Sequence, residues 1–451
     1  MRRCGRFVGS AAIVGVLAVL ATTDGVVAQE DFSPPADERQ APYAMHSEMT
    51  ELPRIAVGVD AGDLRGTDNR VLQAAVDYVA ALGGGLVEVG PGEYLMRDSL
   101  HLRSNVTVRG SGKATVLRKA AGVVSAMALD GDFGEEQITV ANSEGFAVGA
   151  GLAVWDENAG GFHTTVARIT GRRGNTFSIS RPLMADCMVA NGAKAATVFP
   201  VVSGYDIVDA RIENITVEGG RESNVHLNGC RGAGIFLYRG FGTTITGCTV
   251  RGYNGDGISF QQSNDVTVVD CISENNASLG IHPGSGSQRP VVRNCIARGN
   301  GTDGLFLCWR VRHGLFEKNL CEGNGQFGIS IGHKDSDNLL CDNIVRLNGQ
   351  DGVFFRNESE GMGAHRNHLV KNVIENNGTA GGGAGIRIRG YTNDLVFEEN
   401  TIRDTRPKGS QTQRTGVLIE EHVGEITLAK NIIEADVPVV DRRSKQDAAR
   451  K

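Results

Sequence analysis

The amino-acid sequence predicts an all-β fold, a right-handed parallel β-helix solenoid with an N-terminal capping helix and a small inserted β-module. A glycine followed by an apolar strand recurs from Gly234 to Gly352 at intervals of 23, 23, 24, 24 and 24 residues, and again at Gly385 and Gly416 after insertions. Short strands joined by Gly and Asn turns fill these intervals. One such coil cannot bury its own apolar side chains. About eight coils stacked ~4.8 Å apart can, because each strand pairs in parallel with its copies above and below.

Asparagine and cysteine follow the same period, which predicts ladders of like side chains along the stack. Cys248, Cys271 and Cys295 are expected to stack inside as small buried thiols, and we infer neither disulfides nor a metal site from them. The predicted asparagine ladders are Asn276, Asn300, Asn324 and Asn348, and Asn294, Asn319, Asn343, Asn372, Asn400 and Asn431. The residue after each repeat glycine is expected to point inward, in a column of Ile235, Ile258, Ile281, Leu305, Ile329, Val353, Ile386 and Val417.

The N-terminal part of the chain has the features of an exported protein. Residues 1–28 have a basic start, a short apolar run and small residues before the expected cleavage site, a pattern typical of a cleaved signal peptide. The apolar run is too short to span a bilayer. We therefore expect a secreted or periplasmic protein that has no membrane association after cleavage, with residues 29–52 as a linker.

The rest of the chain divides into four predicted segments. Residues 53–119 carry the capping helix, from Asn69 to Leu82 with Asp68 as its N-cap, and the first coils. Residues 120–198 break the repeat and are expected to form an inserted β-rich module. Residues 199–440 form the main β-helix, and the charged residues 441–451 are expected to be a disordered tail.

The charge balance excludes one class of partner. Without residues 1–28 the chain has 43 basic and 51 acidic residues, a net charge near −8. Nucleic-acid binding requires clustered positive charge, so we expect no nucleic-acid partner. The sequence also lacks a nucleophile elbow, a P-loop and a dinucleotide-binding glycine motif followed by a helix.

Two stretches of the sequence resemble a known superfamily. The run from Asn69 through Gly83-Gly84-Gly85 to Gly92-Glu93-Tyr94 looks like the N-terminal signature of the pectate-lyase-like superfamily, and the coils from Gly234 onward look like its β-helix repeat. The resemblance covers most of the chain and implies the fold. The superfamily includes polysaccharide lyases, glycosidases, uronan epimerases and phage tailspikes, so the chemistry must be argued from the site.

Outward positions of the repeated strand are rich in polar and aromatic side chains, which suggests a groove for a polysaccharide. A sheet that faces solvent must also carry polar residues, so a plain solvated face is the alternative. Two residues after the repeat glycine, the strand points outward. This stripe contains Ser259, Gln261, His282, Phe306, Cys308, Ser330, Phe354, Arg356, Arg387 and Arg389, with Trp309, Arg310, His333, Lys334, Asp335, Asn357, Glu358 and Tyr391 at strand ends.

Two chemistries fit this stripe. In β-elimination from a uronic acid, or in C5 epimerisation, a base removes the proton α to a carboxylate whose charge has been neutralised. Lys334 or His333 is the candidate base, and Arg356 or Arg310 is the candidate carboxylate clamp or acid. Some β-helix lyases, which this pattern resembles, use Lys and Arg from adjacent coils. The acidic calcium cluster of those lyases is not matched here. Candidate substrate-binding residues are His282, Trp309, Arg310, Arg387, Arg389 and Gln261.

Glycoside hydrolysis is the alternative, with its two carboxylates drawn from Asp335, Asp337 and Glu358. Asp256, Asp303 and Asp351 directly precede repeat glycines, and their regular placement favours turn hydrogen bonds. A non-catalytic glycan-binding solenoid is a third hypothesis. The sequence leaves the glycan, a requirement for calcium and the oligomeric state open.

Overall fold

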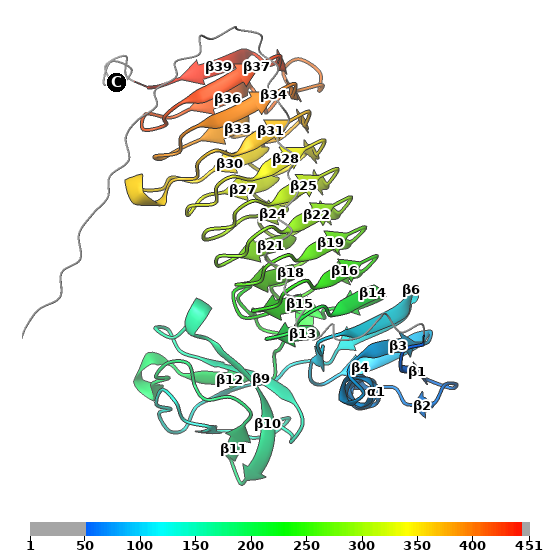
Figure 1. Ribbon diagram of the computed structural model, residues 1–451. Helices are drawn as coiled ribbons and strands as arrows, with labels where there is room; N and C mark the ends of the chain where they lie inside the picture. The colour runs from blue at the N-terminus through cyan, green and yellow to red at the C-terminus, as the bar shows by residue number, and fades with distance from the viewer. Residues whose placement is uncertain (1–50, 444–451) are drawn as a thin grey trace, which may run out of the picture. The chain divides into compact units, whose positions relative to one another are not determined.

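The computed structural model describes residues 51–443, and short parallel strands stacked coil upon coil build its largest part (Figure 1). One sheet has eleven strands, in the order β39-β36-β33-β30-β27-β24-β21-β18-β15-β13-β5. These strands are β5 (Leu100–His101), β13 (Val202–Tyr205), β15 (Ala233–Tyr238), β18 (Asp256–Gln261), β21 (Ile281–Gly284), β24 (Leu305–Phe306), β27 (Ile329–Ile331), β30 (Val353–Phe355), β33 (Ala384–Ile388), β36 (Thr415–Ile419) and β39 (Val437–Asp441).

The remaining strands of the coils form two rows of a 22-stranded sheet. The first row contains β16 (Thr244–Thr246), β19 (Thr267–Val269), β22 (Val291–Arg293), β25 (Leu315–Glu317), β28 (Leu339–Cys341), β31 (His368–Val370), β34 (Leu395–Glu398) and β37 (Ile426–Ala429). The second row contains β17 (Thr249–Arg251), β20 (Ile272–Glu274), β23 (Ile296–Arg298), β26 (Leu320–Glu322), β29 (Ile344–Arg346), β32 (Val373–Glu375), β35 (Thr401–Arg403) and β38 (Ile432–Glu434). Two longer strands, β6 (Val106–Lys119) and β14 (Arg211–Glu218), pair with each other across both rows.

The predicted inward column is confirmed. Ile235, Ile258 and Ile281 lie in register on neighbouring strands and are at most 1% exposed. The same register continues through Leu305 to Val417, so each coil adds one apolar layer to a continuous core. Burial of this column stabilises the stack, whereas a single coil has no partner for it.

The first predicted asparagine ladder is also confirmed. Asn276, Asn300 and Asn324 are buried, and each donates from its side-chain nitrogen to the side-chain oxygen of the next asparagine at 2.9–3.0 Å. The ladder continues through Asn348 to Asn377. Its side-chain amides form hydrogen bonds with backbone groups of the turns that have no partner in the sheets.

The second ladder requires one correction. Asn319, Asn343 and the later members stack as predicted, but Asn294 does not belong to this column. The aligned residue is Cys295, whose backbone N–H donates to Asn319 Oδ1 at 2.9 Å. Asn294 lies one position earlier with a φ of 52° and donates to Asp270 at the surface. The cysteine stack and the asparagine ladder therefore form one column, with buried thiols up to Cys295 and side-chain amides from Asn319 onward.

The N-terminal helix caps the first coils as expected. Helix α1 spans Asn69–Ala81, and the Asp68 side chain accepts from Arg70 N at its N-cap. Its buried face, which includes Leu72 and Val76, packs on β1 (Arg54–Gly58), β3 (Gly85–Val89) and β5. Strands β2 (Leu64–Arg65) and β4 (Gly92–Met96) complete this end. The helix covers a sheet end that would otherwise be open to pairing.

The inserted segment forms a separate antiparallel sheet with its own core. Its strand order is β7-β12-β9-β10-β11-β8, and Phe177 and Leu152 are among its fully buried residues. The strands are β7 (Val124–Ala126), β8 (Gln137–Thr139), β9 (Gly151–Trp155), β10 (Thr165–Arg173), β11 (Thr176–Ile179) and β12 (Lys194–Ala196). Short 3-10 turns, η2 (Gly161–His163) and η3 (Val189–Asn191), lie in its loops, and η4 (Arg221–Ser223) and η5 (Glu360–Met362) lie in loops of the coils.

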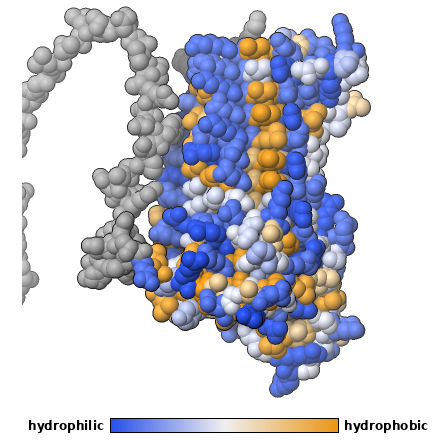
Figure 2. All heavy atoms as spheres, turned by 90° about the vertical axis from the view of Figure 1, so that its right-hand side faces the viewer, coloured by the Kyte–Doolittle hydropathy of each residue, from blue (hydrophilic) through white to orange (hydrophobic). Residues whose placement is uncertain are grey.

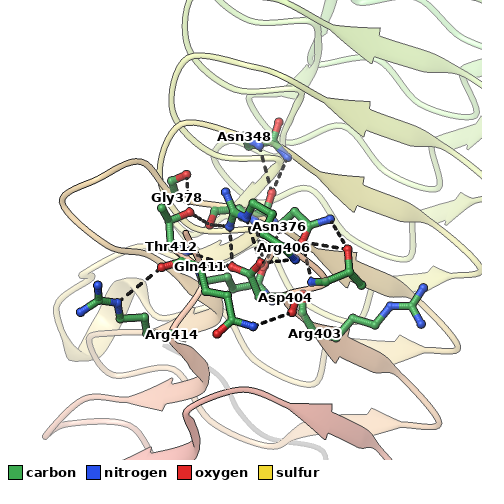
Figure 3. Close-up of polar contacts among 12 residues, drawn as sticks. Asn348, Asn376, Gly378, Arg403, Asp404, Arg406, Gln411, Thr412 and Arg414 are labelled. Atoms are coloured by element: carbon green, nitrogen blue, oxygen red, sulfur yellow. Dashed lines mark hydrogen bonds and ion pairs between the residues drawn. The ribbon is translucent and has the colours of Figure 1, made fainter. Parts of the chain in front are cut away.

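A loop near the C-terminal end replaces one asparagine of the first ladder. Asp404 accepts from the backbone N–H groups of Thr412 and Gln413 at 3.0 and 2.9 Å and pairs with Arg406 (Figure 3). The loop thereby places Gln413 in the ladder, where its Oε1 accepts from Asn377 Nδ2 at 2.8 Å. The insertion changes the surface of this coil without interrupting the interior.

Charged and apolar columns alternate on the outside of the second row. Figure 2 shows an apolar stripe between charged columns, and the row places Ile272, Ile296, Leu320 and Ile344 at one partly exposed position. Beside it, Arg298–Glu274 and Arg346–Glu322 pair between adjacent coils. Exposed pairs of this kind add little stability individually.

The described residues include little of the two predicted terminal segments. The predicted signal peptide, nearly all of the linker, and residues 444–451 lie outside the described residues. Strand β39 ends at Asp441, and Arg442 and Arg443 form ion pairs with Glu420 and Asp441. The described structure therefore continues three residues past the expected start of the tail. Between residues 51 and 443, no helix has the length and apolar character needed to cross a membrane.

Candidate functional site

Four polar residues predicted for the site lie together at the ends of strands β27 and β30. His333 and Asp335 follow β27, while Arg356 and Glu358 follow β30 one coil later. Because Ser330 pairs with Phe354 in register, the segments after these strands run side by side. Arg356 Nη2 lies 3.1 Å from Asp335 Oδ2 and 3.4 Å from His333 Nδ1, and Glu358 Oε1 lies 3.4 Å from His333 Nε2. We call these four residues the polar cluster.

Arg356 is the hub of the polar cluster. Its guanidinium donates to Ser330 Oγ at 2.9 Å and to Leu307 O at 2.6 Å, in addition to Asp335. The side chain is 13% exposed and its carbon Cζ lies 4.3 Å from the centre of the Phe306 ring. Its Nε is buried and makes no hydrogen bond with any of the described residues; the nearest carboxylate oxygen is Glu358 Oε1, at 3.6 Å. The guanidinium is therefore fixed by partners on several sides.

Burial shifts the protonation of two members of the cluster. The Asp335 side chain is 0% exposed, and desolvation raises its pKa to about 7 although Arg356 and two backbone N–H groups favour the ionised form. Burial and the neighbouring Arg356 charge lower the pKa of His333, which Glu358 partly counteracts. Near neutral pH, His333 is therefore an uncharged imidazole with 30% of its side chain accessible.

Trp309 forms one side of the cluster. Its ring stacks on His333 with centroids 5.2 Å apart and an interplanar angle of 16°. Trp309, Arg310, His333 and Lys334 all have positive φ values, between 47° and 68°, so successive coils turn in the same way here and bring the rings into line. Phe162, in η2 of the inserted module, contacts the Trp309 ring edge-on at 6.4 Å. Nothing in the periodic pattern indicates this contact, since the two residues are far apart in sequence.

Lys334 and Arg310 are placed near the cluster but outside its contacts. The Lys334 backbone N–H donates to Met362 O at 2.8 Å, and in the described part of the chain its ammonium makes no hydrogen bond or ion pair. Arg310 is exposed, with its Cζ 5.8 Å from the Trp309 ring centre. Both remain candidate residues whose roles are predictions.

His282 and Gln261 face outward as expected but do not line an open groove. They are 3% and 1% exposed. His282 Nδ1 lies 2.7 Å from Asp256 Oδ2, and its Nε2 lies 3.4 Å from Gln261 Nε2. The loop before β15 covers them: Ser259 donates to Gly229 O, and a Cβ on Gly229 would lie 1.6 Å from Asp256 Oδ2. Glycine at this position permits the close approach of the loop.

Three further candidates lie outside the polar cluster, and two of them pair with other residues. Asp337 pairs with Arg366 at 2.6 Å and takes no part in the polar cluster. Arg387, in register with Phe354, pairs with Glu420 at 2.9 Å, an acidic partner that the sequence analysis did not include. Arg389 is half-buried and makes no ion pair with any residue in 51–443. The cluster therefore ends at the coil of β30.

Asp303 and Asp351 make the turn hydrogen bonds expected of them. Asp303 accepts from Phe327 N at 3.2 Å, and Asp351 from Ala384 N at 2.7 Å. Burial raises the pKa of Asp303 to about 6. No group of three or more His, Cys, Asp or Glu residues suited to a metal ion occurs between residues 51 and 443.

Comparisons with known proteins agree with this architecture. A family model described as "Right handed beta helix region" matches residues 169–312 and 233–402. The curated proteins contain no match to the sequence.

Solved structures give the same picture of the fold at low identity. The chain is similar to the A-module of the Azotobacter vinelandii mannuronan C-5 epimerase AlgE6, with a TM-score of 0.52, 16% identity, and coverage of 82% of this chain and 91% of that one. It is similar to ORF18 of Geobacillus virus E2, with a TM-score of 0.50, 11% identity and coverage of 86% and 62%.

Proposed function

The chain belongs to the family of right-handed β-helix proteins, and within it we propose an enzyme that acts on a uronic-acid-containing polysaccharide. The proposed first step removes the proton α to a sugar carboxylate, which leads either to β-elimination or to C5 epimerisation. The observation that carries the proposal is the neutral, partly accessible His333 held between an aromatic ring and a fixed guanidinium. The mannuronan epimerase module that shares the fold acts on a substrate of this class.

His333 is the proposed base. Its contacts to Arg356 and Glu358 are both 3.4 Å long, so they orient the ring only weakly, and a nitrogen lone pair is available when a substrate displaces one of them. A lowered pKa keeps the imidazole unprotonated near neutral pH, the form that accepts a proton. The proton from the sugar carbon goes to the imidazole, and the electron pair moves into the carboxylate.

Arg356 is the proposed carboxylate clamp. Removing a proton α to a carboxylate places a second negative charge beside the first, and a fixed cation in a desolvated site stabilises it. Hydrogen bonds to Ser330 Oγ, Leu307 O and Asp335 hold the Arg356 guanidinium in place before a substrate arrives. Stacking of Trp309 against the apolar face of a sugar would position the ring.

Hydrolysis is less well supported by the same geometry. It requires two carboxylates that flank the glycosidic bond. Asp335 is fully enclosed and accepts from Val311 N, Gly332 N and Arg356, while Asp337 faces Arg366. Only Glu358, with a side chain 10% exposed, is left for this role.

The test is a panel of uronans and neutral polysaccharides with three readouts. Elimination gives an unsaturated product with ultraviolet absorbance, hydrolysis gives new reducing ends without that absorbance, and epimerisation in D₂O gives deuterium at C5 in NMR spectra. We expect deuterium incorporation or unsaturation on at least one uronan. Reducing ends from a neutral glycan, abolished by Glu358→Gln, would instead show hydrolysis, and retention on an affinity gel with no product would show a binding protein.

Variants then assign the base. His333→Gln is expected to lower the rate by about 10²-fold or more, the usual contribution of a positioned base. Lys334→Ala serves as the matched control from the same turn and is expected to stay within a few-fold of the wild type. The reverse pattern would make Lys334 the base.

The proposal places the reaction outside the cytoplasm. The support is the predicted signal peptide of residues 1–28. N-terminal sequencing of the protein recovered from the periplasm or medium should find a start near residue 29, and a full-length cytoplasmic protein would contradict it.

A further inference from the structure

A cavity of about 240 Å³ lies where the inserted module meets the first coils. One wall comes from the coils, with His101 on β5 and Tyr205 on β13. The other wall comes from the module, with Arg168 on β10 and Arg181 just after β11. The cavity is remote from the polar cluster, and none of its residues takes part in the proposed reaction. We call it the N-terminal pocket.

The N-terminal pocket has an excess of positive charge. Arg103, Arg168 and Arg181 line it, against a single carboxylate, Asp98. Asp98 is already used: it lies 3.0 Å from His101 Nε2 and forms an ion pair with Arg168 Nε. Arg103 pairs with Asp77, and both side chains of that pair are more than 40% exposed, so solvent screens it. The pocket therefore attracts an anion.

Arg181 is the cation best placed to receive one. Its carbon Cζ lies 3.5 Å from the centre of the Tyr205 ring, a cation–π contact that holds the guanidinium beside an aromatic wall. It makes no ion pair with any residue between 51 and 443. A guanidinium fixed in this way loses little conformational freedom on binding, and its donors match a carboxylate or sulfate in bidentate geometry.

One in-register row of residues runs from the pocket toward the polar cluster, and its first two members are tyrosines. Tyr205 and Tyr238 are in register on β13 and β15, and the same row continues through Gln261 and Gly284 to Cys308, the residue before Trp309. Arg231 lies 5.2 Å from the Tyr238 ring centre and donates to Phe162 O at 2.6 Å. Four strand spacings of ~4.8 Å place Tyr205 about 19 Å from Cys308 along the stack.

We propose that the N-terminal pocket is a distal subsite that binds the anionic substituent of a sugar residue several units away from the reacting one, with Arg181 as its main ligand. This inference rests on the proposed function, because it takes the substrate to be an acidic polysaccharide long enough to reach both places. It makes the enzyme selective for long polyanionic chains. Short acidic fragments that occupy only the polar cluster bind independently of Arg181.

Binding measurements on an inactive protein test the subsite apart from the reaction. His333→Gln protein is titrated calorimetrically with octasaccharides and disaccharides of galacturonate, mannuronate, guluronate and glucuronate, with sulfated neutral octasaccharides as a second arm and unsulfated neutral octasaccharides as the blank. When Arg181→Gln is introduced into the His333→Gln protein, the affinity for at least one anionic octasaccharide should fall by about tenfold or more, the usual loss for one charge-assisted contact. Disaccharide binding should change less than twofold.

Two matched variants separate binding from folding. Arg173→Gln removes one charge from an exposed position at the end of β10 and should leave affinity unchanged. Arg181→Lys keeps the charge and should recover part of the affinity. Thermal midpoints measured in parallel show whether the module remains folded.

The outcomes distinguish the two proposals. Binding of uronate or sulfated octasaccharides that depends on Arg181 supports the subsite and identifies its anion. If the wild type then shows neither elimination nor C5 exchange, the proposed function alone is refuted. If the wild type turns over a uronan polymer and Arg181→Gln changes neither KM nor affinity, the subsite is refuted and the function stands. Equal loss with Arg173→Gln, or binding only of neutral chains, also refutes the subsite.

Discussion

The protonation of Asp335 predicts how stability changes with pH, and the perturbation that isolates it is Asp335→Asn. Burial raises the pKa of this carboxyl to about 7 in the folded protein, from an ordinary value of 3.8. The folded state therefore binds the proton more tightly than the unfolded state. Its contribution to stability is present at acid pH and is lost as the pH rises through the interval between the two values.

The magnitude follows from these two pKa values. Between pH 5 and pH 8 the wild type should lose about 3 kcal/mol of stability from this one group, a loss that Asp335→Asn cannot show because an amide does not titrate. The substitution also places an amide N–H₂ near Gly332 N, which donates to Asp335 Oδ2 at 3.0 Å. The stability lost because two N–H donors then face each other is independent of pH, so it cancels when the two pH values are compared.

The assay is urea unfolding of wild type and Asp335→Asn at both pH values. Asp337→Asn is the matched control, since Asp337 lies two residues away and its carboxyl has a lowered pKa: burial acts to raise the pKa, but the hydrogen-bonded ion pair with Arg366 outweighs it. Because Asp337→Asn retains Asp335, this control should lose stability between pH 5 and pH 8 as the wild type does, so its difference from the wild type should be the same at both pH values. A wild type that holds or gains stability relative to Asp335→Asn as the pH rises would refute the reasoning, because it would mean that Arg356 keeps Asp335 ionised.

Three further predictions concern activity and the scaffold. The kcat/KM of the wild type should rise with pH and level off with a midpoint below 6.5, because activity needs unprotonated His333 and its pKa is lowered; a midpoint above 6.5 in the pH profile would contradict this. Trp309→Ala should raise KM about tenfold through loss of stacking, and an unchanged KM in steady-state kinetics would remove Trp309 from the binding site. Asn348→Ala breaks buried side-chain hydrogen bonds to Asn324, Asn377 and Cys321 O and should cost about 4 kcal/mol in denaturant unfolding, whereas a cost under about 1 kcal/mol would show that the ladder is not stabilising.

The fold could be predicted from the sequence because each coil repeats the same local solution. Inward isoleucines and turn asparagines recur at one period, so one correct register places all of them. The exception was Asn294, one residue away from the true column. In a turn of this kind, adjacent positions point in opposite directions, and the pattern of asparagines alone does not say which of two neighbours is buried.

The site was predicted less completely, for a different reason. Proximity within neighbouring coils follows from the register, so His333 and Asp335 were expected near Arg356 and Glu358, and the structure brings them together. Access does not follow from the register. His282 occupies an outward position but is enclosed by the loop around Gly229, and loops have no period from which their course can be inferred.

The inserted module gives the site a direction that the coils alone lack. Successive coils have the same backbone geometry, so the backbone alone does not distinguish one coil from the next as the place where a long polymer reacts. Phe162 breaks that equivalence by contacting Trp309 on one side of the polar cluster, and the carbonyl of Phe162 is held by Arg231 from the coils. Both of these contacts lie on coils N-terminal to His333, while the cluster ends at the coil of β30 on the other side. An acidic chain bound at both Arg181 and Arg356 would therefore be held in one register, with its reacting sugar at the polar cluster.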